Sequence, residues 1–172
     1  MENALYSSEL YSHDGKLLED HLVGVADIAI QNMNEVPDKV FSHYDKRILL
    51  KLVKVCALCH DIGKSTLYFQ EYLFAPENKK NSLKSKNETR HGLLSAIAAY
   101  FIAKAEFEAD DLLRGDEGDL LPFIAFLAVR RHHGNFYDVM NEAILSEKEK
   151  SVLLKQVESI DKAKLAIVNE KM

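Results

Sequence analysis

Apolar residues recur at helical spacing along most of this chain, and this periodicity limits the possible folds more than any other feature. Residues 16–33 carry them at positions 17, 18, 22, 25, 26, 29, 30 and 33, which places them on one face of a helix. Similar patterns predict helices over 45–59, 65–74, 91–107, 120–133, 138–145 and 146–169. No segment sustains the alternation typical of a strand. The sequence therefore predicts an all-α fold, a bundle of about 6–8 helices.

Capping residues set the expected boundaries of these helices. Asp14 is the expected N-cap of the first helix. Pro122 is expected in the first turn of 120–133, and Ser146 with Glu149 forms a capping box. Residues 75–90 are polar and lysine-rich and contain Pro76, so they are expected to form a mobile loop.

The composition indicates a soluble globular protein. A length of 172 residues suits a single domain over 1–172. No apolar run approaches the roughly 20 residues of a membrane span, so we expect a cytoplasmic protein without a membrane partner. The formal charge of −5 argues against a protein that holds nucleic acid mainly by a basic surface. It does not exclude an enzyme that receives nucleic acid from a partner.

The only cysteines, Cys56 and Cys59, precede His60 and so match the haem c attachment signature. That attachment needs an exposed loop in an exported protein, whereas these cysteines lie in an apolar helix. A redox pair would need a βαβ context, which is missing. We expect both thiols to be small buried groups.

The pentad 60–64, His-Asp-Ile-Gly-Lys, closes the most apolar of the expected helices. His60 and Asp61 offer a neutral nitrogen and an anionic oxygen, which suit a divalent metal of intermediate softness. A helix rotates about 100° per residue, so two neighbours share one site only where the helix end points at it. Gly63 is expected to supply that end.

Four more histidines lie at expected helix ends or in first turns: His21, His91, His132 and His133. A single histidine on a helix is more often structural than a ligand, but here the doubled histidine precedes Gly134 just as the His-Asp pair precedes Gly63. His91 begins a helix, where the dipole favours the neutral, metal-binding imidazole. Two helix C-termini and one N-terminus can thus meet around one or two ions.

The ordered set H…HD…H…HH, with Ile-Gly-Lys after the HD pair, resembles the HD phosphohydrolase superfamily. Within it, the chain is most similar to the HD nuclease domain of the CRISPR-associated type I interference nuclease-helicase. The matching segments are 18–22, 57–64, 69–73, 90–96 and 131–134, within residues 11–138. The Phe69-Gln70 pair is typical of this branch rather than of HD enzymes in general.

This resemblance implies an HD-domain helical bundle around a metal site and an enzyme that cuts single-stranded DNA with two divalent ions. It further implies a helicase and a crRNA-guided surveillance complex as partners. One ion would be held by His21, His60 and Asp61. The other would be held by Asp61, His91, His132 and His133. Asp61 would bridge the ions, and Lys64 would stabilise charge at the scissile phosphate.

So many histidines and so few carboxylates favour a transition metal. Such a site leans away from Mg²⁺ and toward Mn, Ni, Co or Fe. The family carries one further aspartate on a later helix, which completes the first metal site. Asp161, the only aspartate in 146–169, lacks similar surroundings. We expect that the chain ends before that ligand; the alternative is that Asp161 takes the role.

The remaining candidates concern nucleic acid. Residues 79–90 hold five basic residues and one acid, and such a segment offers nonspecific phosphate contacts, with a solvated loop as the alternative. The candidates for these contacts are Lys79, Lys80, Lys84, Lys86, Arg90 and Arg131. Phe69 could stack on bases, although core packing is favoured for it. His13 could support the metal site or cap the surface.

Two other functions stay open. The first is a different HD phosphohydrolase, acting on a nucleotide or cyclic nucleotide; the Phe69-Gln70 pair and the doubled histidine argue against it. The second is a non-catalytic helical interaction domain whose histidines are structural. That alternative predicts neither metal binding nor a functional effect of changing Asp61.

Overall fold

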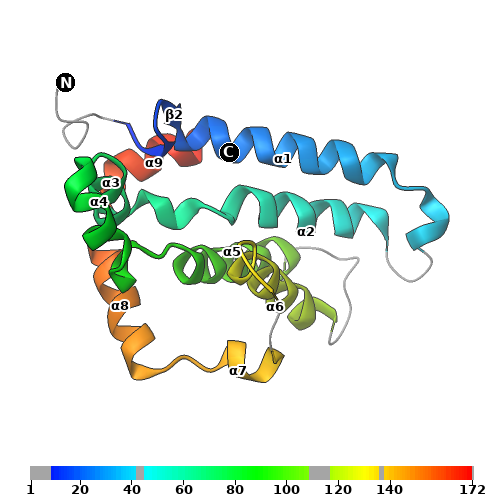
Figure 1. Ribbon diagram of the computed structural model, residues 1–172. Helices are drawn as coiled ribbons and strands as arrows, with labels where there is room; N and C mark the ends of the chain where they lie inside the picture. The colour runs from blue at the N-terminus through cyan, green and yellow to red at the C-terminus, as the bar shows by residue number, and fades with distance from the viewer. Residues whose placement is uncertain (1–8, 42–44, 109–116, 136–137, 172) are drawn as a thin grey trace.

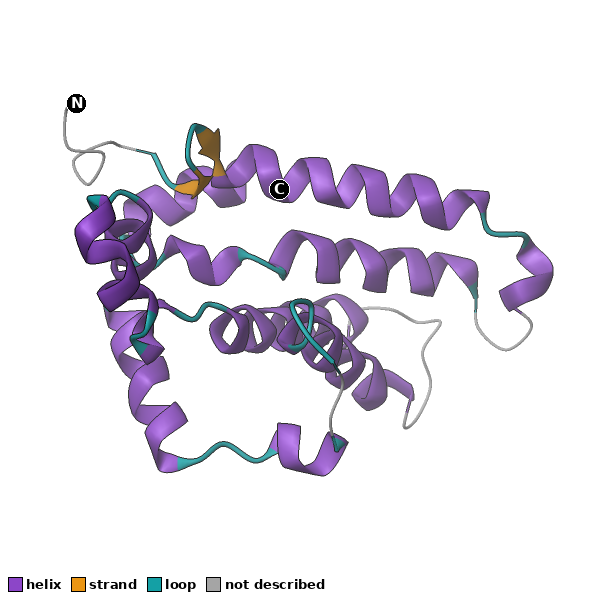
Figure 2. Ribbon diagram, in the orientation of Figure 1, coloured by secondary structure: helices purple, strands orange, loops and turns teal. Residues whose placement is uncertain are grey.

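The computed structural model describes residues 9–41, 45–108, 117–135 and 138–171, and this part of the chain is almost entirely helical (Figures 1 and 2). The all-α prediction is confirmed. The α-helices are α1 (Leu18–Glu35), α2 (Lys46–Cys59), α3 (Leu67–Leu73), α4 (Glu77–Lys84), α5 (Gly92–Glu108), α6 (Glu117–Arg130), α7 (Val139–Ala143), α8 (Glu147–Glu158) and α9 (Lys162–Lys171). Within the described residues, three 3₁₀ segments connect them: η2 (Asp38–Phe41), η3 (Ile62–Ser65) and η4 (Asn87–Thr89).

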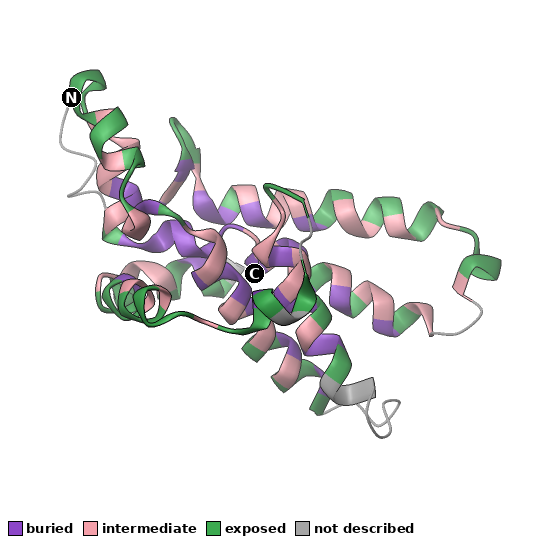
Figure 3. Ribbon diagram, turned by 60° about the horizontal axis from the view of Figure 1, so that its bottom comes forward, coloured by how far each residue is buried: buried purple, intermediate pink, exposed green. Residues whose placement is uncertain are grey.

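The larger hydrophobic core lies where α2, α5 and α6 meet, while α1 runs alongside α2 (Figure 1). Ala96, Ala99 and Ala103 of α5 have no exposed surface. These small side chains allow α5 and α6 to pack closely along most of their lengths. Phe107 closes the far end of this core at 2% exposure, and removing such a ring costs about 3–5 kcal/mol. Buried residues follow the inward faces of the helices (Figure 3).

A smaller core joins the two ends of the described chain. Leu18 and Leu22 of α1 have no exposed surface. They belong to one cluster with Ile62 of η3 and Val168 of α9. Figure 1 shows α9 beside the start of α1. The C-terminal helix thus packs against the segment that follows the His-Asp pair.

The start of α1 differs from the prediction. A short antiparallel pair, β1 (Tyr11–His13) and β2 (Lys16–Leu17), precedes the helix. Gly15 in its turn has a φ of 72°, a conformation that glycine adopts without strain. Asp14 therefore lies in this turn and does not cap α1. Leu17 stands at the N-cap position and makes no side-chain hydrogen bond there.

The prediction of a loop over 75–90 is wrong in part, because α4 and η4 occupy most of it. Pro76 stands just before α4, where proline does not disrupt a helix. Glu77 and Lys80 form an ion pair of 3.6 Å along it. The helix buries none of its residues, and a helix without an apolar face leaves no periodic pattern in the sequence.

Two other helices have different bounds from those expected. The segment 146–169 divides at Ser159 into α8 and α9, although the capping box of Ser146 and Glu149 is confirmed. Helix α6 begins at Glu117 and ends at Arg130, so Pro122 lies in its second turn. The doubled histidine therefore follows α6 rather than ending it. Residues 109–116, in the acidic stretch before α6, fall outside the described part.

No helix in the described residues is both long enough and apolar enough to cross a membrane.

We predict that neither cysteine reacts with a thiol reagent in the folded protein. Both are free and lie in α2, and burial raises the pKa of Cys56 to about 11 and that of Cys59 to about 12. At pH 8 about 0.1% or less of such thiols is ionised, and only the thiolate reacts. Labelling with a disulfide reagent should proceed only after denaturation. Rapid labelling of the native protein would instead favour a redox pair.

Candidate metal centre

His60 directly follows α2 and is oriented by that helix. Its Nδ1 lies 2.6 Å from the carbonyl oxygen of Ala57. A carbonyl only accepts hydrogen bonds, so Nδ1 carries the proton, and Nε2 of the neutral ring presents a lone pair. The backbone of the last helical turn thus fixes both the tautomer and the direction of this ring.

His132 is the second residue after α6 and is oriented in the same way. Its Nδ1 lies 2.6 Å from the carbonyl oxygen of Val129. Its Nε2 is therefore also a lone pair in the neutral ring, and it lies 3.4 Å from Oδ1 of Asp61. Such a bond from the far nitrogen to a carbonyl is the usual support for a metal-binding histidine.

Asp61 lies between two pairs of histidines and is 2% exposed. Its Oδ2 is 2.9 Å from Nε2 of His21 and 3.3 Å from Nε2 of His60. Its Oδ1 is 2.9 Å from Nε2 of His91 and 3.4 Å from Nε2 of His132. Each carboxylate oxygen therefore faces a different pair of rings.

These residues form two groups that could each hold an ion, with ligand atoms within 4.8 Å of one another. One group is His21, His60 and Asp61. The other is Asp61, His91, His132 and His133. His133 is the exposed member, and its Nε2 lies 3.1 Å from that of His91. The structure thus brings together all six residues singled out in the sequence as ligands.

The donor atoms fit a divalent metal ion. Oδ1 of Asp61 and Nε2 of His132 are buried and have no hydrogen-bond partner within the described residues. An anionic oxygen and a lone pair that face each other are unfavourable without a cation or a proton between them. Imidazole nitrogens with one carboxylate suit Mn, Fe, Co, Ni or Zn better than Mg²⁺.

The electrostatics of the centre keep Asp61 ionised. Burial alone would raise the pKa of Asp61, but its contacts with the surrounding histidines and with Lys64 hold that pKa far below its ordinary range. Partial burial lowers the pKa of His21, and partial desolvation together with the neighbouring His132 and His91 lowers the pKa of His133, so both rings are neutral near pH 7. Neutral imidazole is the form that binds a metal.

His60 behaves differently from these two rings. Burial acts to lower its pKa, but the interactions with Asp61 and with the carbonyl of Ala57 outweigh that effect and raise it. Without a metal, a proton on His60 is therefore stabilised beside the carboxylate. A divalent ion held there would take the place of that proton, so metal binding would weaken as the pH falls.

Lys64 is buried beside the same carboxylate, with 5% of its surface exposed. Its Nζ lies 2.8 Å from Oδ2 of Asp61 and donates to the carbonyl of Ser12 at 3.3 Å. The ammonium also lies 5.3 Å from the centre of the Phe69 ring. Phe69 is 7% exposed and meets the ring of His91 edge-on. The expected packing of Phe69 in the interior is confirmed.

Two buried glutamines hold the backbone around the site. The amide Nε2 of Gln70 donates to the carbonyls of Lys64 and Tyr11, at 2.8 Å each. This ties η3 to β1. Gln156 of α8 donates to the carbonyls of Glu88 and Arg90, also at 2.8 Å each, just before His91. Sequence reasoning missed Gln156, because one amide in a polar helix gives no periodic signal.

Gly63 has a different role from the expected one. Helix α2 ends at Cys59, and no described glycine except Gly15 has a positive φ. A Cβ on Gly63 would lie 2.5 Å from the carbonyl oxygen of His91. The Gly63 N–H donates to Oγ of Ser95 at 2.9 Å. Glycine is needed here because η3 touches the start of α5, and that contact brings His91 to Asp61.

A cleft of about 500 Å³ opens beside the candidate ligands. Lys64, His91 and His133 line it, together with Phe69 and Tyr72. Of the basic residues proposed for nucleic acid, Lys84 and Arg90 also line this cleft. Lys79 and Lys86 are exposed on the same segment, Lys80 pairs with Glu77, and Arg131 pairs with Glu142. The last four do not line the cleft.

His13 and Asp161 lie outside both ligand groups. His13 is exposed, with Nδ1 3.1 Å from Oγ of Ser12 and its ring against that of His21. Asp161 is exposed at the start of α9, where its Oδ1 accepts from the backbone N–H groups of Ala163 and Lys164. The expectation that a last aspartate is missing stays a prediction.

A buried carboxylate shared by two groups of histidines at the ends of helices defines the HD class of metal-dependent hydrolases. The family model for the Cas3 HD domain matches residues 9–170. The chain therefore belongs to this family, whose members are CRISPR-associated HD nucleases. Comparison with curated proteins and with solved structures gives no match.

We predict that Gly63→Ala destabilises the protein and weakens metal binding. The added methyl group would push η3 away from His91, and such overpacking costs about 1–3 kcal/mol. Gly24→Ala is the matched control, because no atom lies within 4 Å of the added Cβ in α1, and alanine favours a helix. Thermal unfolding and metal titration measure both effects. If Gly63→Ala and Gly24→Ala had the same unfolding temperature and the same metal affinity, the close contact at Gly63 would not be required.

We also predict that Mn²⁺ or Ni²⁺ raises the thermal stability of the protein. An ion present at 100 times its dissociation constant stabilises the folded state by about 2.7 kcal/mol. Asp61→Ala should abolish this rise, because both ligand groups contain that carboxylate. Asp161→Asn should leave the number of bound ions unchanged, since asparagine caps a helix as well as aspartate does. Fewer ions in Asp161→Asn, by elemental analysis, would show that Asp161 contributes a ligand.

Proposed function

We propose that this domain is a metal-dependent nuclease that cleaves single-stranded DNA during CRISPR interference. It would act in the cytoplasm with a helicase and a crRNA-guided surveillance complex. The observation that carries this proposal is the position of Asp61, whose two oxygens face two separate groups of histidines. A bridging carboxylate of this kind suits a pair of ions that act on one phosphodiester.

When bound, such ions supply an activated water and neutralise charge on the phosphate. The protein itself orients the side chains that would hold these ions. The helix-end carbonyls aim His60 and His132 inward. The ammonium of Lys64 balances the charge of Asp61 and lines the cleft, where it adds positive charge near an incoming phosphate.

The cleft has features that suit a single strand. Tyr72, which is partly exposed, offers aromatic surface in its wall, and bases stack on such rings with little sequence preference. Lys84 and Arg90 add cationic groups, which contact phosphates irrespective of sequence. A nucleotide or cyclic nucleotide would need fewer of these contacts.

We predict cleavage of labelled single-stranded DNA in Mn²⁺, Ni²⁺ or Co²⁺ and weaker cleavage in Mg²⁺. Asp61→Ala should reduce the rate by at least about 100-fold, since even residues that only support metal ligands contribute 10–100-fold. Asp38→Ala is the matched control, because Asp38 is an exposed residue paired with Lys46 outside the site.

Parallel assays with nucleotides and cyclic nucleotides separate the alternatives. Hydrolysis of these small substrates without DNA cleavage would indicate a different HD phosphohydrolase. If no substrate reacts and elemental analysis finds no metal, a non-catalytic interaction domain is the better account. Activity in Mg²⁺ alone would contradict the preference for a transition metal.

A further inference from the structure

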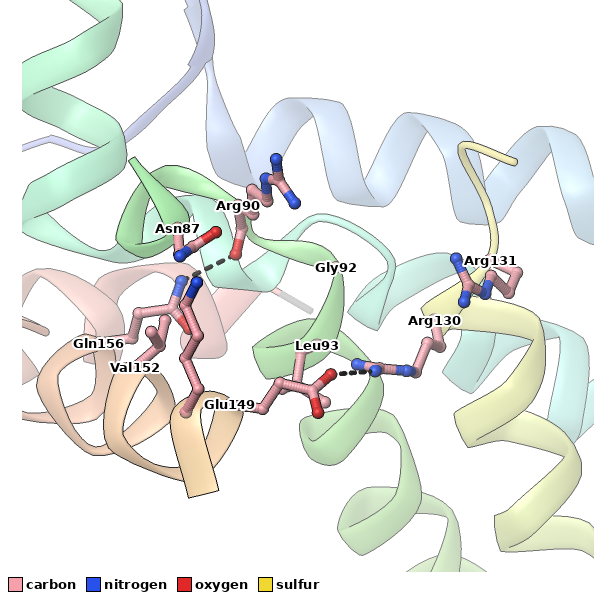
Figure 4. Close-up of a pocket in the computed structure, with 10 residues that line it drawn as sticks. Asn87, Arg90, Gly92, Leu93, Arg130, Arg131, Glu149, Val152 and Gln156 are labelled. Carbon is pink, nitrogen blue, oxygen red and sulfur yellow. Dashed lines mark hydrogen bonds and ion pairs between the residues drawn. The ribbon is translucent and has the colours of Figure 1, made fainter. Parts of the chain in front are cut away.

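A second cavity, of about 390 Å³, lies where η4, the start of α5, the end of α6 and α8 meet (Figure 4). Nothing in the proposed catalytic chemistry uses it. Arg90 lines both this cavity and the cleft beside the metal centre. Arg90 is thus the residue at which the two spaces come together.

The lining of this cavity is cationic, although the whole chain has a formal charge of −5. Arg90, Arg130, Arg131 and Lys148 line it, against the single carboxylate of Glu149. Arg90 and Lys148 are exposed and form no ion pair within the described part of the chain. A concave surface of one charge concentrates ligands of the opposite charge.

Two of these cations are held in fixed positions. Glu142, which is 5% exposed, binds Nε of Arg130 at 2.9 Å and also binds the guanidinium of Arg131. Nη2 of Arg130 reaches Glu149 at 2.7 Å, as Figure 4 shows. A guanidinium has five N–H donors, so the two bonds of Arg130 leave others for a ligand. Glu142 and Glu149 offset much of the positive charge of Arg130 and Arg131. The excess positive charge of the cavity therefore comes from Arg90 and Lys148.

The backbone also fixes this cavity relative to the metal centre. Gln156, in the cavity wall, donates to the carbonyl of Arg90 at 2.8 Å (Figure 4). His91 is the next residue, and its Nε2 lies 2.9 Å from Asp61. The backbone of Arg90 is therefore kept in a constant relation to the ligand groups.

We propose that this cavity is a subsite for the nucleic-acid strand, which holds phosphates beyond the scissile one. The proposal rests on the proposed function and deepens it. The ligand class is a polyanion with regularly spaced phosphates, because two spaces that carry cationic side chains and share Arg90 suit a chain of charges. A single free anion would occupy only one of them. Lys148 and Arg90 make the contacts that depend on strand length.

The test is binding of a fluorescent single strand of about 20 nucleotides to the full chain, followed by anisotropy at several salt concentrations. Lys148→Glu should weaken binding at least about 5-fold and reduce the slope of log affinity against log salt by about 0.7 for each phosphate that is no longer neutralised. Lys150→Glu is the matched control. It lies on the same helix and changes the charge equally, but Lys150 pairs with Glu147 and does not line the cavity.

Arg90→Ala provides a second variant, which should also weaken strand binding and reduce the salt slope. Circular dichroism melts of all three variants establish that each is folded. Equal loss of affinity in Lys148→Glu and Lys150→Glu would show an effect of net charge alone and overturn the proposal. Saturable binding of inorganic phosphate that disappears in Lys148→Glu, with strand affinity unchanged, would identify a free-anion site and also overturn it.

Failure of the proposed function would look different from these outcomes. It would appear as no cleavage of DNA by the unmodified chain with metal added. The binding measurement needs no metal and no turnover, so it still decides whether the cavity holds a strand.

Discussion

The arrangement of this domain depends on one buried carboxylate. Asp61 is 2% exposed and must remain ionised there, and an isolated buried charge is costly. Lys64 and the surrounding histidines compensate for that cost, and they come from four separate parts of the chain. Helices α1, α2, α5 and α6 must therefore meet at this point for the fold to tolerate Asp61.

The sequence was sufficient to place the candidate ligands near helix ends, because capping signals and apolar periodicity lie close to each of them. It could not show which oxygen of Asp61 faces which histidine, since that depends on how α1 and α5 approach in space. Gly63 illustrates the limit. Its position in the pentad indicated a helix stop. In the structure, however, glycine is required because the backbone of His91, a residue distant in sequence, lies too close for a side chain.

The fold shows the same division between local and tertiary information. The small residues Ala96, Ala98 and Ala99 of α5 indicate close packing, and Ala96 and Ala99 are fully buried while Ala98 is partly buried. Helix α4 escaped prediction because it has no buried face. The break between α8 and α9 escaped because both sides of it are polar. There, Ile160 bridges to Thr66, and that tertiary contact, rather than a local breaker such as glycine or proline, accompanies the break.

The distribution of charge bears on how a strand would reach the proposed site. A net charge of −5 repels DNA at long range, but salt screens such forces beyond about 8 Å in the cell. Lys84, Arg90 and Lys148 attract phosphates only within that short range. Long-range steering would therefore contribute little to the capture of a strand. For the proposed function, delivery of the strand by a partner, followed by short-range contacts, would fit this charge pattern.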